Sequence, residues 1–324
     1  MNDNGLNTLL SQLKGQRVLI FPHISPDGDT IGSAIGMRHL LLEKGVEGII
    51  VLNDDVPLNL SFLTNKLPVG AMIKGGAVDF QYEYVFAVDC AEPKLFSDRD
   101  TLIGEGVKLI NIDHHHTNKK YGLVSIVDVE ASSTGELIYS LIEDLGIALD
   151  ELSAEALYTA IVTDTGSFRY SNTRPYTFKA CSKLIEYPFD FNALNVELFQ
   201  NKPFEKVELL NRVFNTLKRF EEGKVAFAKL DQHLKAELNY EDYDTDGIVE
   251  YIRDIQGVEV VVFLKATDDG KVKGSLRAKN DFDVSRISQL FGGGGHIKAA
   301  GFTSTLHMDE LEAQIIKAIC EQMR

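Results

Sequence analysis

Four short segments of the sequence place aspartate or histidine at spacings that suit the binding of divalent cations. They are HISPDGD, with His23, Asp27 and Asp29; VFAVDC, with Asp89; NIDHHH, with Asp113, His114, His115 and His116; and IVTDTGSFR, with Asp164. Carboxylate oxygens combined with imidazoles suit Mn²⁺ or Mg²⁺ better than they suit a thiolate zinc site. Two such cations about 3.5–4 Å apart can clamp a phosphoryl group and activate water near neutral pH.

Each segment by itself also has a structural explanation. Asp-Gly turns are common, so Asp27 and Asp29 fit an acidic turn with an aspartate that caps the next helix. Asp89 fits a hydrogen-bonded structural aspartate, and the histidine run fits a solvated turn. An aspartate near the end of a helix, such as Asp164, is unremarkable alone. The four together favour metal binding, because four carboxylates and two imidazoles are about what a pair of divalent cations needs.

Three of these segments follow apolar runs that predict buried strands, at Arg17–Phe21, Tyr84–Val88 and Val107–Ile112. The carboxyl ends of neighbouring parallel strands converge, so the ligands could meet at one edge of a sheet. The other elements predicted here are strands Gly48–Leu52 and Leu123–Val127 and helices Thr30–Lys44, Ser133–Leu145, Glu151–Val162 and Pro175–Glu186. This alternation predicts an α/β domain with a mostly parallel sheet and helices on both faces.

The pattern changes after about residue 190, and a smaller α+β domain is expected there. We predict a catalytic metal-binding domain over 1–190, a linker region over 191–205 and a substrate-binding domain over 206–324, with the active-site cleft between the domains. The expected elements are helices Phe204–Phe220 and Val284–Phe291, a final helix from Asp309, strands Lys224–Leu230, Val258–Ala266 and Lys271–Ala278, and a short strand near Gly301–Thr305.

The glycine run Gly292–Gly295, followed by His296, is a second candidate site. It is not a P-loop, because the Lys298 that follows is succeeded by alanine, and it does not complete a dinucleotide-binding fingerprint. A flexible linker is the alternative interpretation. Exposed backbone N–H groups could instead receive a phosphate or a base edge, with Arg277 as a partner for the anion. The predicted substrate-binding residues are Arg277, Gly293, Gly294, Gly295 and His296.

Composition limits the possible partners. The net charge of −15 argues against a broad basic surface that grips long duplex nucleic acid, although a small phosphorylated ligand remains compatible. The three cysteines are far apart and suggest free thiols in a reducing compartment. No signal-peptide pattern and no apolar run long enough for a membrane span is visible, so a cytoplasmic location without membrane contact is expected.

The order of these motifs resembles the DHH phosphoesterase superfamily, which includes exonucleases and manganese-dependent inorganic pyrophosphatases. HISPDGD, VDC, DHH and TDTGSF stand in the family's order, and GGGGHIKAAGF resembles the signature of the DHH-associated C-terminal domain. The strings ASSTGE and SFRYSNT resemble the stand-alone nanoRNase and pAp phosphatase branch. The resemblance covers nearly the whole chain and implies a two-metal phosphoesterase that hydrolyses short oligoribonucleotides or dinucleotides, including cyclic ones, and 3′-phosphoadenosine 5′-phosphate.

The resemblance also implies roles for individual residues. It implies one cation on His23, Asp27 and Asp89 and a second on Asp29, Asp89, His114 and Asp164. His115 would face the scissile phosphate as a catalytic residue, and Asp113 would orient the histidines. The expected cations are Mn²⁺ first, with Mg²⁺ or Co²⁺ as alternatives. A manganese pyrophosphatase and a non-catalytic nucleotide sensor stay open as alternative functions, and a homodimer stays open as the assembly.

Overall fold

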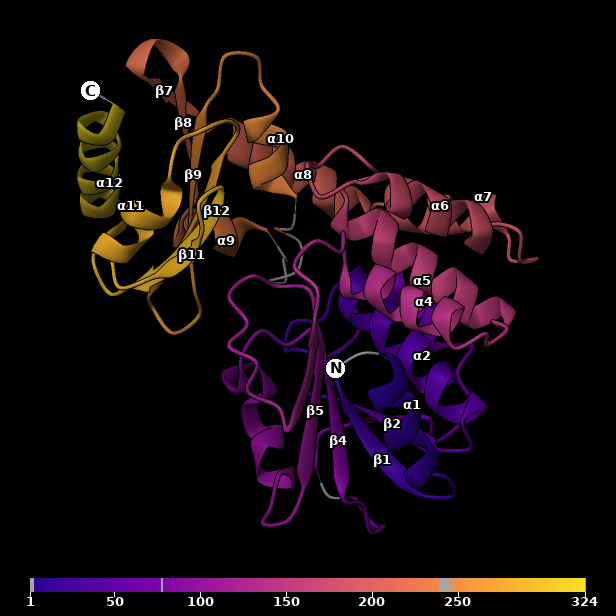
Figure 1. Cartoon of the computed structure of the whole chain (residues 1–324). Coiled ribbons are helices and arrows are strands. Elements are labelled where there is room, and N and C mark those ends of the chain that lie inside the picture. Colours follow the sequence, from indigo (N-terminus) through magenta and orange to yellow (C-terminus); the bar gives the residue numbers. More distant parts are fainter. Residues whose placement is uncertain (1–2, 77, 239–244, 246, 324) are drawn as a thin grey trace. The chain divides into compact units, whose positions relative to one another are not determined.

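The structure is a computed structural model that describes residues 3–76, 78–238, 245 and 247–323. The chain divides into two compact units, Met1–Asn201 and Lys202–Arg324. Each unit contains one six-stranded sheet covered by helices (Figure 1). The prediction of an α/β unit followed by a smaller α+β unit is therefore confirmed.

The sheet of the first unit is parallel throughout, with strand order β3-β2-β1-β4-β5-β6. Its strands are β1 (Arg17–Phe21), β2 (Glu47–Leu52), β3 (Met72–Lys74), β4 (Tyr84–Val88), β5 (Lys108–Asp113) and β6 (Val124–Val127). β4 is an uninterrupted apolar run that is buried along its whole length, as expected for a strand covered on both faces. The strand order reverses between β1 and β4, and such a switch point is where open α/β sheets bind ligands at their carboxyl edge.

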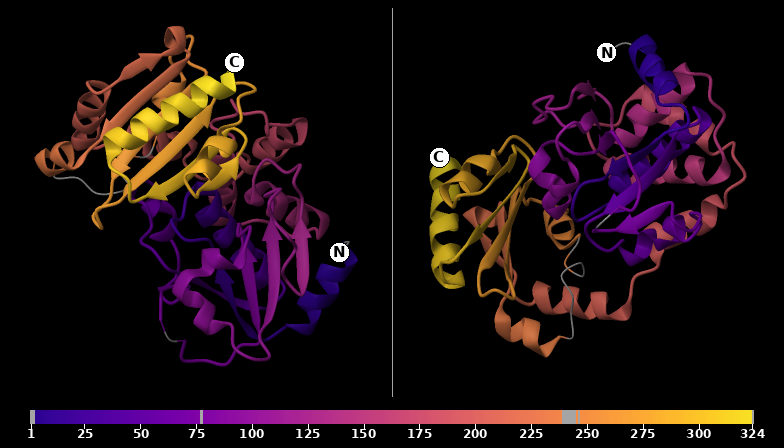
Figure 2. Two further views of the ribbon diagram at one scale, coloured as in Figure 1. Left: turned by 90° about the vertical axis from the view of Figure 1, so that its left-hand side faces the viewer. Right: turned by 90° about the horizontal axis from the view of Figure 1, so that it is seen from below.

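The α-helices of this unit pack on one face of the sheet (Figures 1 and 2). The 3₁₀ helix η2 contributes Phe96 to the apolar cluster on the other face. The helices are α1 (Asp3–Gln12), α2 (Gly28–Glu43), η1 (Leu58–Leu60), α3 (Ser61–Thr64), η2 (Pro93–Leu102), α4 (Thr134–Asp144), α5 (Glu151–Asp164), α6 (Pro175–Leu184), α7 (Phe191–Asn195) and the π-helical η3 (Val196–Gln200). The segment 191–205, predicted as a linker region, thus contains α7 and η3.

Helices α2 and α5 approach each other unusually closely because α2 presents glycine to α5 at every fourth residue. A Cβ atom on Gly32 would lie 2.2 Å from the carbonyl oxygen of Ala156, and one on Gly28 would lie 2.3 Å from Oγ1 of Thr163. Residues four apart share one face of a helix, so the stripe forms a continuous contact. This contact brings Asp29, in the first turn of α2, toward Asp164, the last residue of α5.

The sheet of the second unit has the order β11-β12-β10-β9-β8-β7, and only the β8–β9 pair is parallel. Helices α11 and α12 pack on one face and α8 and α10 on the other. The elements are α8 (Phe204–Phe214), β7 (Lys218–Phe220), η4 (Glu221–Gly223), β8 (Val225–Leu230), α9 (Gln232–Glu237), α10 (Ile248–Arg253), β9 (Val260–Ala266), β10 (Val272–Ala278), α11 (Val284–Leu290), β11 (Gly294–His296), β12 (Ala299–Ser304) and α12 (Met308–Met323).

The predicted helix Phe204–Phe220 is wrong in its second half. Helix α8 ends at Phe214, and Lys218–Phe220 form the edge strand β7. The hydroxyl of Thr216 accepts a hydrogen bond from the backbone N–H of Lys229 at 2.9 Å, which ties the turn after α8 to β8. This tertiary hydrogen bond outweighs the helical periodicity of the segment.

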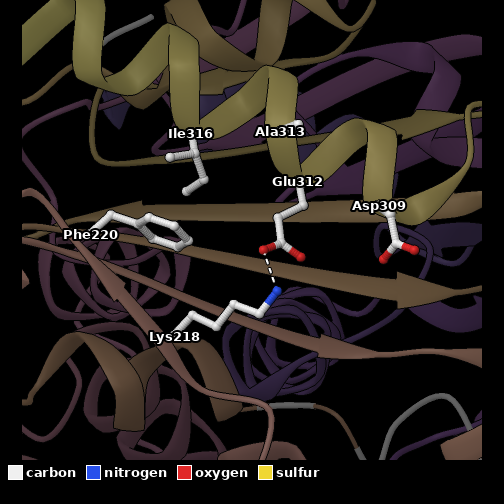
Figure 3. Close-up of a pocket in the computed structure, with 6 residues that line it drawn as sticks. All are labelled: Lys218, Phe220, Asp309, Glu312, Ala313 and Ile316. Atoms are coloured by element: carbon white, nitrogen blue, oxygen red, sulfur yellow. Dashed lines mark hydrogen bonds and ion pairs between the residues drawn. The ribbon is translucent and has the colours of Figure 1, made fainter.

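A pocket of about 310 Å³ lies beside β7 and α12 in the second unit (Figure 3). Nζ of Lys218 lies 2.5 Å from Oε1 of Glu312 there, and Asp309 pairs with Lys229 at 3.0 Å. These charges already have partners, so we assign no ligand to this pocket. In the part of the chain that the structure describes, no helix is both long enough and apolar enough to cross a bilayer.

Candidate metal centre

The predicted cation ligands meet at the carboxyl edge of the first sheet. The loop that begins at His23 follows β1, Asp89 follows β4, and His114 follows β5, and these three strands are neighbours. Asp164 joins them from the last turn of α5. The predicted convergence of these segments is therefore present in the structure.

The ligand atoms form three groups in which every atom lies within 4.8 Å of the others. The groups are His23, Asp27 and Asp89; Asp29, His114 and Asp164; and Asp89, His114 and His115. Asp89 and His114 each belong to two groups, so the three form one connected cluster, hereafter the His–Asp cluster. All its members lie in the first unit.

Asp89 turns its two oxygens toward different members of the cluster. Oδ2 lies 2.9 Å from the hydroxyl oxygen of Thr30 and 3.4 Å from Nε2 of His23. Oδ1 accepts from the Thr134 hydroxyl at 2.9 Å and lies 3.6 Å from Nδ1 of His115. The backbone φ of Asp89 is 58°, in a region that costs a non-glycine residue about 1–2 kcal/mol. This turn at the strand end gives the carboxylate its two-sided position.

Hydrogen bonds to carbonyl groups set the ring orientation of two histidines. Nδ1 of His114 lies 3.2 Å from the carbonyl oxygen of Ala131, and Nδ1 of His23 lies 2.5 Å from that of Ile24. A carbonyl oxygen can only accept, so both Nδ1 atoms carry the proton. Nε2 of each ring is thereby left to face the carboxylates with its lone pair, as a metal ligand requires.

The buried carboxylates repel one another. Asp29 is 2% exposed, and burial, followed by the charges of Asp89, Asp164 and Asp27, raises the pKa of its carboxyl well above the ordinary value. Burial also raises the pKa of Asp164 to about 7, with Asp89 and Asp27 adding to the shift and His114 opposing it. Divalent cations would relieve this repulsion, and the oxygen and imidazole donors fit them. The donor atoms of the His–Asp cluster therefore fit the predicted divalent cations.

The N-terminus of α4 holds Asp29 in place. The backbone N–H groups of Thr134 and Gly135 each donate to the Asp29 carboxylate at 2.8 Å, and the hydroxyl of Ser33 donates at 2.9 Å. A helix N-terminus stabilises an anion through its free N–H groups and the helix dipole. The string ASSTGE thus supports the cluster directly.

A hydrogen-bonded chain leads from the strand β5 to His115. Nδ1 of His115 lies 2.7 Å from Oδ1 of the fully buried Asp113, and Nδ2 of Asn118 donates to Oδ2 of Asp113 at 2.6 Å. Burial opposes the charge of His115, but the hydrogen bond to Asp113 and the charges of Asp89, Asp113 and Asp164 raise its pKa to about 9. The predicted orienting contact between Asp113 and His115 is present.

The interpretation of Asp27 as a helix cap is compatible with its role as a metal ligand. Asp27 is the N-cap of α2, because its Oδ1 accepts from the backbone N–H of Thr30 at 2.9 Å. Its carboxylate nevertheless belongs to the ligand group of His23 and Asp89. The cap fixes Asp27 at the start of α2 and so helps to place it beside the other ligands.

Sequence reasoning did not assign site roles to Thr30, Thr134 or Asn118. Oγ1 of Thr30 lies 2.6 Å from Nε2 of His23 and 2.9 Å from Oδ1 of Asp27. Only their positions in the sequence could have indicated two of these residues. Thr30 directly follows Asp29, and Asn118 lies four residues after His114. Threonine and asparagine are common in turns and caps, so such a signal has little specificity.

The predicted substrate-binding residues lie in the second unit, and none of the three groups of metal-type ligands found among the described residues belongs to that unit. Arg277 on β10 is opposite Ala299 on β12, which is opposite His296 on β11. Directly opposed residues point to the same face, so Arg277 and His296 flank the small Ala299. Nε of Arg277 donates to Glu250 at 3.1 Å. Their role toward a substrate stays a prediction.

The glycine run is an ordered part of the sheet. Gly294–His296 form β11, paired with β12 across a tight turn. A Cβ atom on Gly293 would lie 2.2 Å from the carbonyl oxygen of Gly301. Gly295 has φ +138°, and a Cβ atom there would lie 2.5 Å from the carbonyl oxygen of Ala299. Gly294 has open space around it. Glycine is therefore required at Gly293 and Gly295 by close packing, and the flexible-linker alternative does not describe this segment.

Comparison with known proteins identifies the family to which this chain belongs. The profile described as "DHH family, N-terminal domain" matches residues 17–161, and that of the "DHHA1 domain" matches residues 222–324. A protein of Thermus thermophilus, named bifunctional oligoribonuclease and PAP phosphatase NrnA, is 32% identical over 318 residues, covering 94% of this chain and 90% of that protein. The chain belongs to the DHH family.

Two further proteins extend the comparison of this DHH-family chain. A Bacillus subtilis protein of the same name is 29% identical, with coverage of 94% of this chain and 95% of that protein. A solved Bacteroides fragilis structure, described as an exopolyphosphatase-related protein, has a TM-score of 0.88 at 23% identity and covers 99% of this chain and 98% of that one. The last likeness shows that the fold is shared along the whole chain.

Proposed function

We propose that this DHH-family chain is a two-cation phosphoesterase that hydrolyses short oligoribonucleotides or dinucleotides to mononucleotides, and 3′-phosphoadenosine 5′-phosphate to AMP. The observation that carries the proposal is the meeting of His23, Asp89, His114 and Asp164, drawn from separate segments, at one edge of the sheet. The names of the two NrnA relatives support the substrate class. A cytoplasmic location and Mn²⁺ as the cation are parts of the same proposal.

One cation would be held by His23, Asp27 and Asp89, and the other by Asp29, Asp89, His114 and Asp164. The two-sided contacts of Asp89 support its assignment as the shared ligand. When bound, a cation pair supplies charge neutralisation for phosphoryl oxygens and a nucleophile at neutral pH.

His115 is the residue of this chain that we assign to the phosphate. Its Nδ1 is engaged by Asp113, so Nε2 can donate a hydrogen bond to a phosphoryl oxygen or a proton to the leaving oxygen. Asp113, held by Asn118, fixes the ring orientation and stabilises the imidazolium form. The contribution of such a positioned donor is typically about 100-fold or more in rate.

The second unit would recognise the part of the substrate that does not react. Arg277 and His296 offer a guanidinium and an imidazole on one face, separated by Ala299. Guanidinium groups suit phosphate, and the open space around Gly294 suits the approach of a nucleotide. Arg277→Ala should weaken hydrolysis of the dinucleotide pApA much more than hydrolysis of bis-p-nitrophenyl phosphate. Equal loss on both substrates would contradict this division of roles.

The proposal is tested by comparing turnover of pApA, 3′-phosphoadenosine 5′-phosphate and pyrophosphate with Mn²⁺, each with a chelator control. We expect metal-dependent release of AMP from the first two substrates and little release of phosphate from pyrophosphate. Preferred turnover of pyrophosphate would identify a pyrophosphatase instead. Binding of the nucleotides without turnover under every cation would identify a sensor.

A further inference from the structure

The first unit contains a pocket of its own, at the end of β1 opposite to the His–Asp cluster. Its wall includes Arg17, the first residue of β1, and Glu47, the first residue of β2. The cluster begins just after the last residue of β1, so about 15 Å of strand separates the two places, at roughly 3.3 Å per residue. The pocket encloses about 630 Å³, and small-molecule sites typically enclose about 300–1,000 Å³.

Arg38, a half-buried residue of α2, also lines this pocket. Its Nε atom is buried, and no described residue accepts a hydrogen bond from it. Burial lowers the pKa of Arg38 from its ordinary value, an effect that the charges of Asp150 and Glu47 oppose. A half-buried cation that has lost water without gaining an acceptor is costly. An anion in the pocket could not reach the enclosed Nε atom, but it could accept from the terminal amino groups of the same guanidinium, which have no hydrogen bond or ion pair within the described residues.

Arg17 adds a second guanidinium with free donors. Its Nε donates to Oε2 of Glu47 at 2.7 Å, and its guanidinium lies 5.1 Å from the centre of the Phe80 ring. Within the described parts of the chain, nothing accepts from its two terminal amino groups. Asp79 also lines the pocket but forms no ion pair with either arginine among the described contacts. The lining therefore contains two arginines and two acidic residues, of which only Arg17 and Glu47 form an ion pair in the described part of the chain.

The remaining wall is largely apolar, with Phe80, Ile49, Ile73 and Val78. The pocket in Figure 3 provides the contrast, because its Lys218 is already paired with Glu312. An apolar wall combined with unmatched donors suits a ligand that has an anionic end and an apolar or flat body. Guanidinium groups match phosphate oxygens in geometry better than they match a point anion such as chloride.

We propose that this pocket is a second ligand site, separate from the His–Asp cluster, that binds an organic phosphomonoester of about mononucleotide size. The phosphate would accept hydrogen bonds from Arg17 and Arg38, and the body of the ligand would lie against Phe80 and the aliphatic side chains. The site uses no residue of the His–Asp cluster, so the inference does not depend on the proposed function.

The test is calorimetric titration of the full-length chain with AMP in EDTA and low chloride, so that no divalent cation can hold phosphate at the His–Asp cluster. In an Arg277→Ala background, which removes the guanidinium proposed to bind nucleotides in the second unit, we expect one AMP per chain. Arg38→Gln should weaken binding by about 10-fold or more, the range for a hydrogen bond to a charged group. Adenosine and inorganic phosphate should each bind about 10-fold more weakly than AMP, because each lacks one half of the recognised chemistry.

Matched variants distinguish this site from others. Arg17→Gln should weaken AMP binding as Arg38→Gln does, with melting temperatures used to verify that both variants fold. Lys218→Gln, in the pocket of Figure 3, and Asp89→Asn should both bind AMP with unchanged affinity. Absence of AMP binding in EDTA, normal binding by both arginine variants, or loss of binding in Asp89→Asn would each overturn the proposal. Inorganic phosphate binding as tightly as AMP would overturn the role of the apolar wall.

Discussion

The carboxylate of Asp89 contacts two groups of ligands through different oxygens, so its removal should affect both cation positions at once. We predict that Asp89→Asn abolishes turnover and weakens Mn²⁺ binding by at least ~10–100-fold, measured by calorimetry, while the melting temperature in EDTA stays close to that of the parent. Asp144→Asn, on the exposed end of α4, is the matched control and should behave as the parent protein. Near-normal cation affinity in Asp89→Asn would show that Asp89 is not the shared ligand.

Asn118 donates a hydrogen bond to Asp113, the residue that holds His115, so on the proposed assignment it would influence the phosphate only indirectly. Asn118→Ala should lower kcat by about 10–100-fold with KM changed by no more than about 3-fold, because the variant loses ring orientation rather than a substrate contact. Steady-state kinetics on pApA measures both values. A raised KM at unchanged kcat would mean that Asn118 contacts substrate instead.

Aspartate and histidine at strand ends could be predicted from the sequence because their chemistry is costly to bury without a purpose. Thr30 and Thr134 could not, since their importance comes from hydroxyl contacts to Asp89, which lies 59 and 45 positions away. The position of Arg38 could not be predicted either, because only the fold shows that its buried Nε atom lacks an acceptor among the described residues. A local pattern cannot reveal a contact that depends on tertiary structure.

At the scale of elements, the glycine stripe of α2 sets the approach of α2 to α5. A Cβ atom on Gly32 would lie 2.2 Å from the carbonyl oxygen of Ala156, which is backbone and cannot move aside cheaply. We predict that Gly32→Ala lowers the free energy of unfolding by about 1–3 kcal/mol and weakens Mn²⁺ binding, because Asp29 and Asp164 are pushed apart. Chemical denaturation and calorimetry measure the two effects.

Gly104→Ala is the matched control for this experiment, because nothing lies within 4 Å of a Cβ atom there. It should be no less stable than the parent and should bind Mn²⁺ normally. Equal stability of Gly32→Ala and the parent would mean that α2 and α5 can separate without cost.

The same helix pair carries a pH-dependent contact. Burial lowers the pKa of His39, but hydrogen bonds to Asp150 and Ala148 outweigh it, so the net pKa is raised. Asp150 is the N-cap of α5, and its pKa is lowered. The hydrogen bond from His39 is the largest cause of this shift. Stability from a raised histidine pKa is full below about pH 6.5 and is lost as pH rises through the folded value. Stability from the aspartate is full above about pH 4 and is lost as pH falls toward its depressed value.

We therefore predict that His39→Gln lowers the melting temperature most near pH 5–6, by about 1–4 °C, and less as the pH rises above 7. Melting temperatures of the variant and parent from pH 5 to 9 in EDTA measure the difference. A difference that grows toward pH 9 would contradict the direction of the shift.

Elements with strong local patterns could be predicted, and those without could not. β4 is an apolar run of five buried residues, and the prediction of Tyr84–Val88 is confirmed. β11 consists of two glycines and His296, and it forms only because close packing holds Gly293 and Gly295 against β12. β7 is a three-residue edge strand that continues a helical pattern. Pairing partners, rather than side-chain periodicity, define such strands.

At the scale of the whole molecule, the net charge of −15 bears on substrate length. Long-strand nucleases depend on many phosphate contacts, and each nucleotide beyond the recognised end would meet an acidic chain without new contacts. We predict that kcat/KM is highest for 5′-phosphorylated RNA of two to about five nucleotides and falls for longer strands. A length series from dimer to 24-mer at fixed ionic strength with Mn²⁺ measures this. A preference for the 24-mer would contradict it and indicate a hidden basic groove.

The cation ligands are far apart in the sequence, from His23 to Asp164, and they meet only when the sheet and the α2–α5 contact are complete. On the proposed assignment, an unfolded chain holds no such site, so the free energy of cation binding is also free energy of folding. Cation at about 100 times its Kd would add ~2.7 kcal/mol to the stability of the native state. The supply of that cation would then affect how long a newly made chain survives as well as how fast it works.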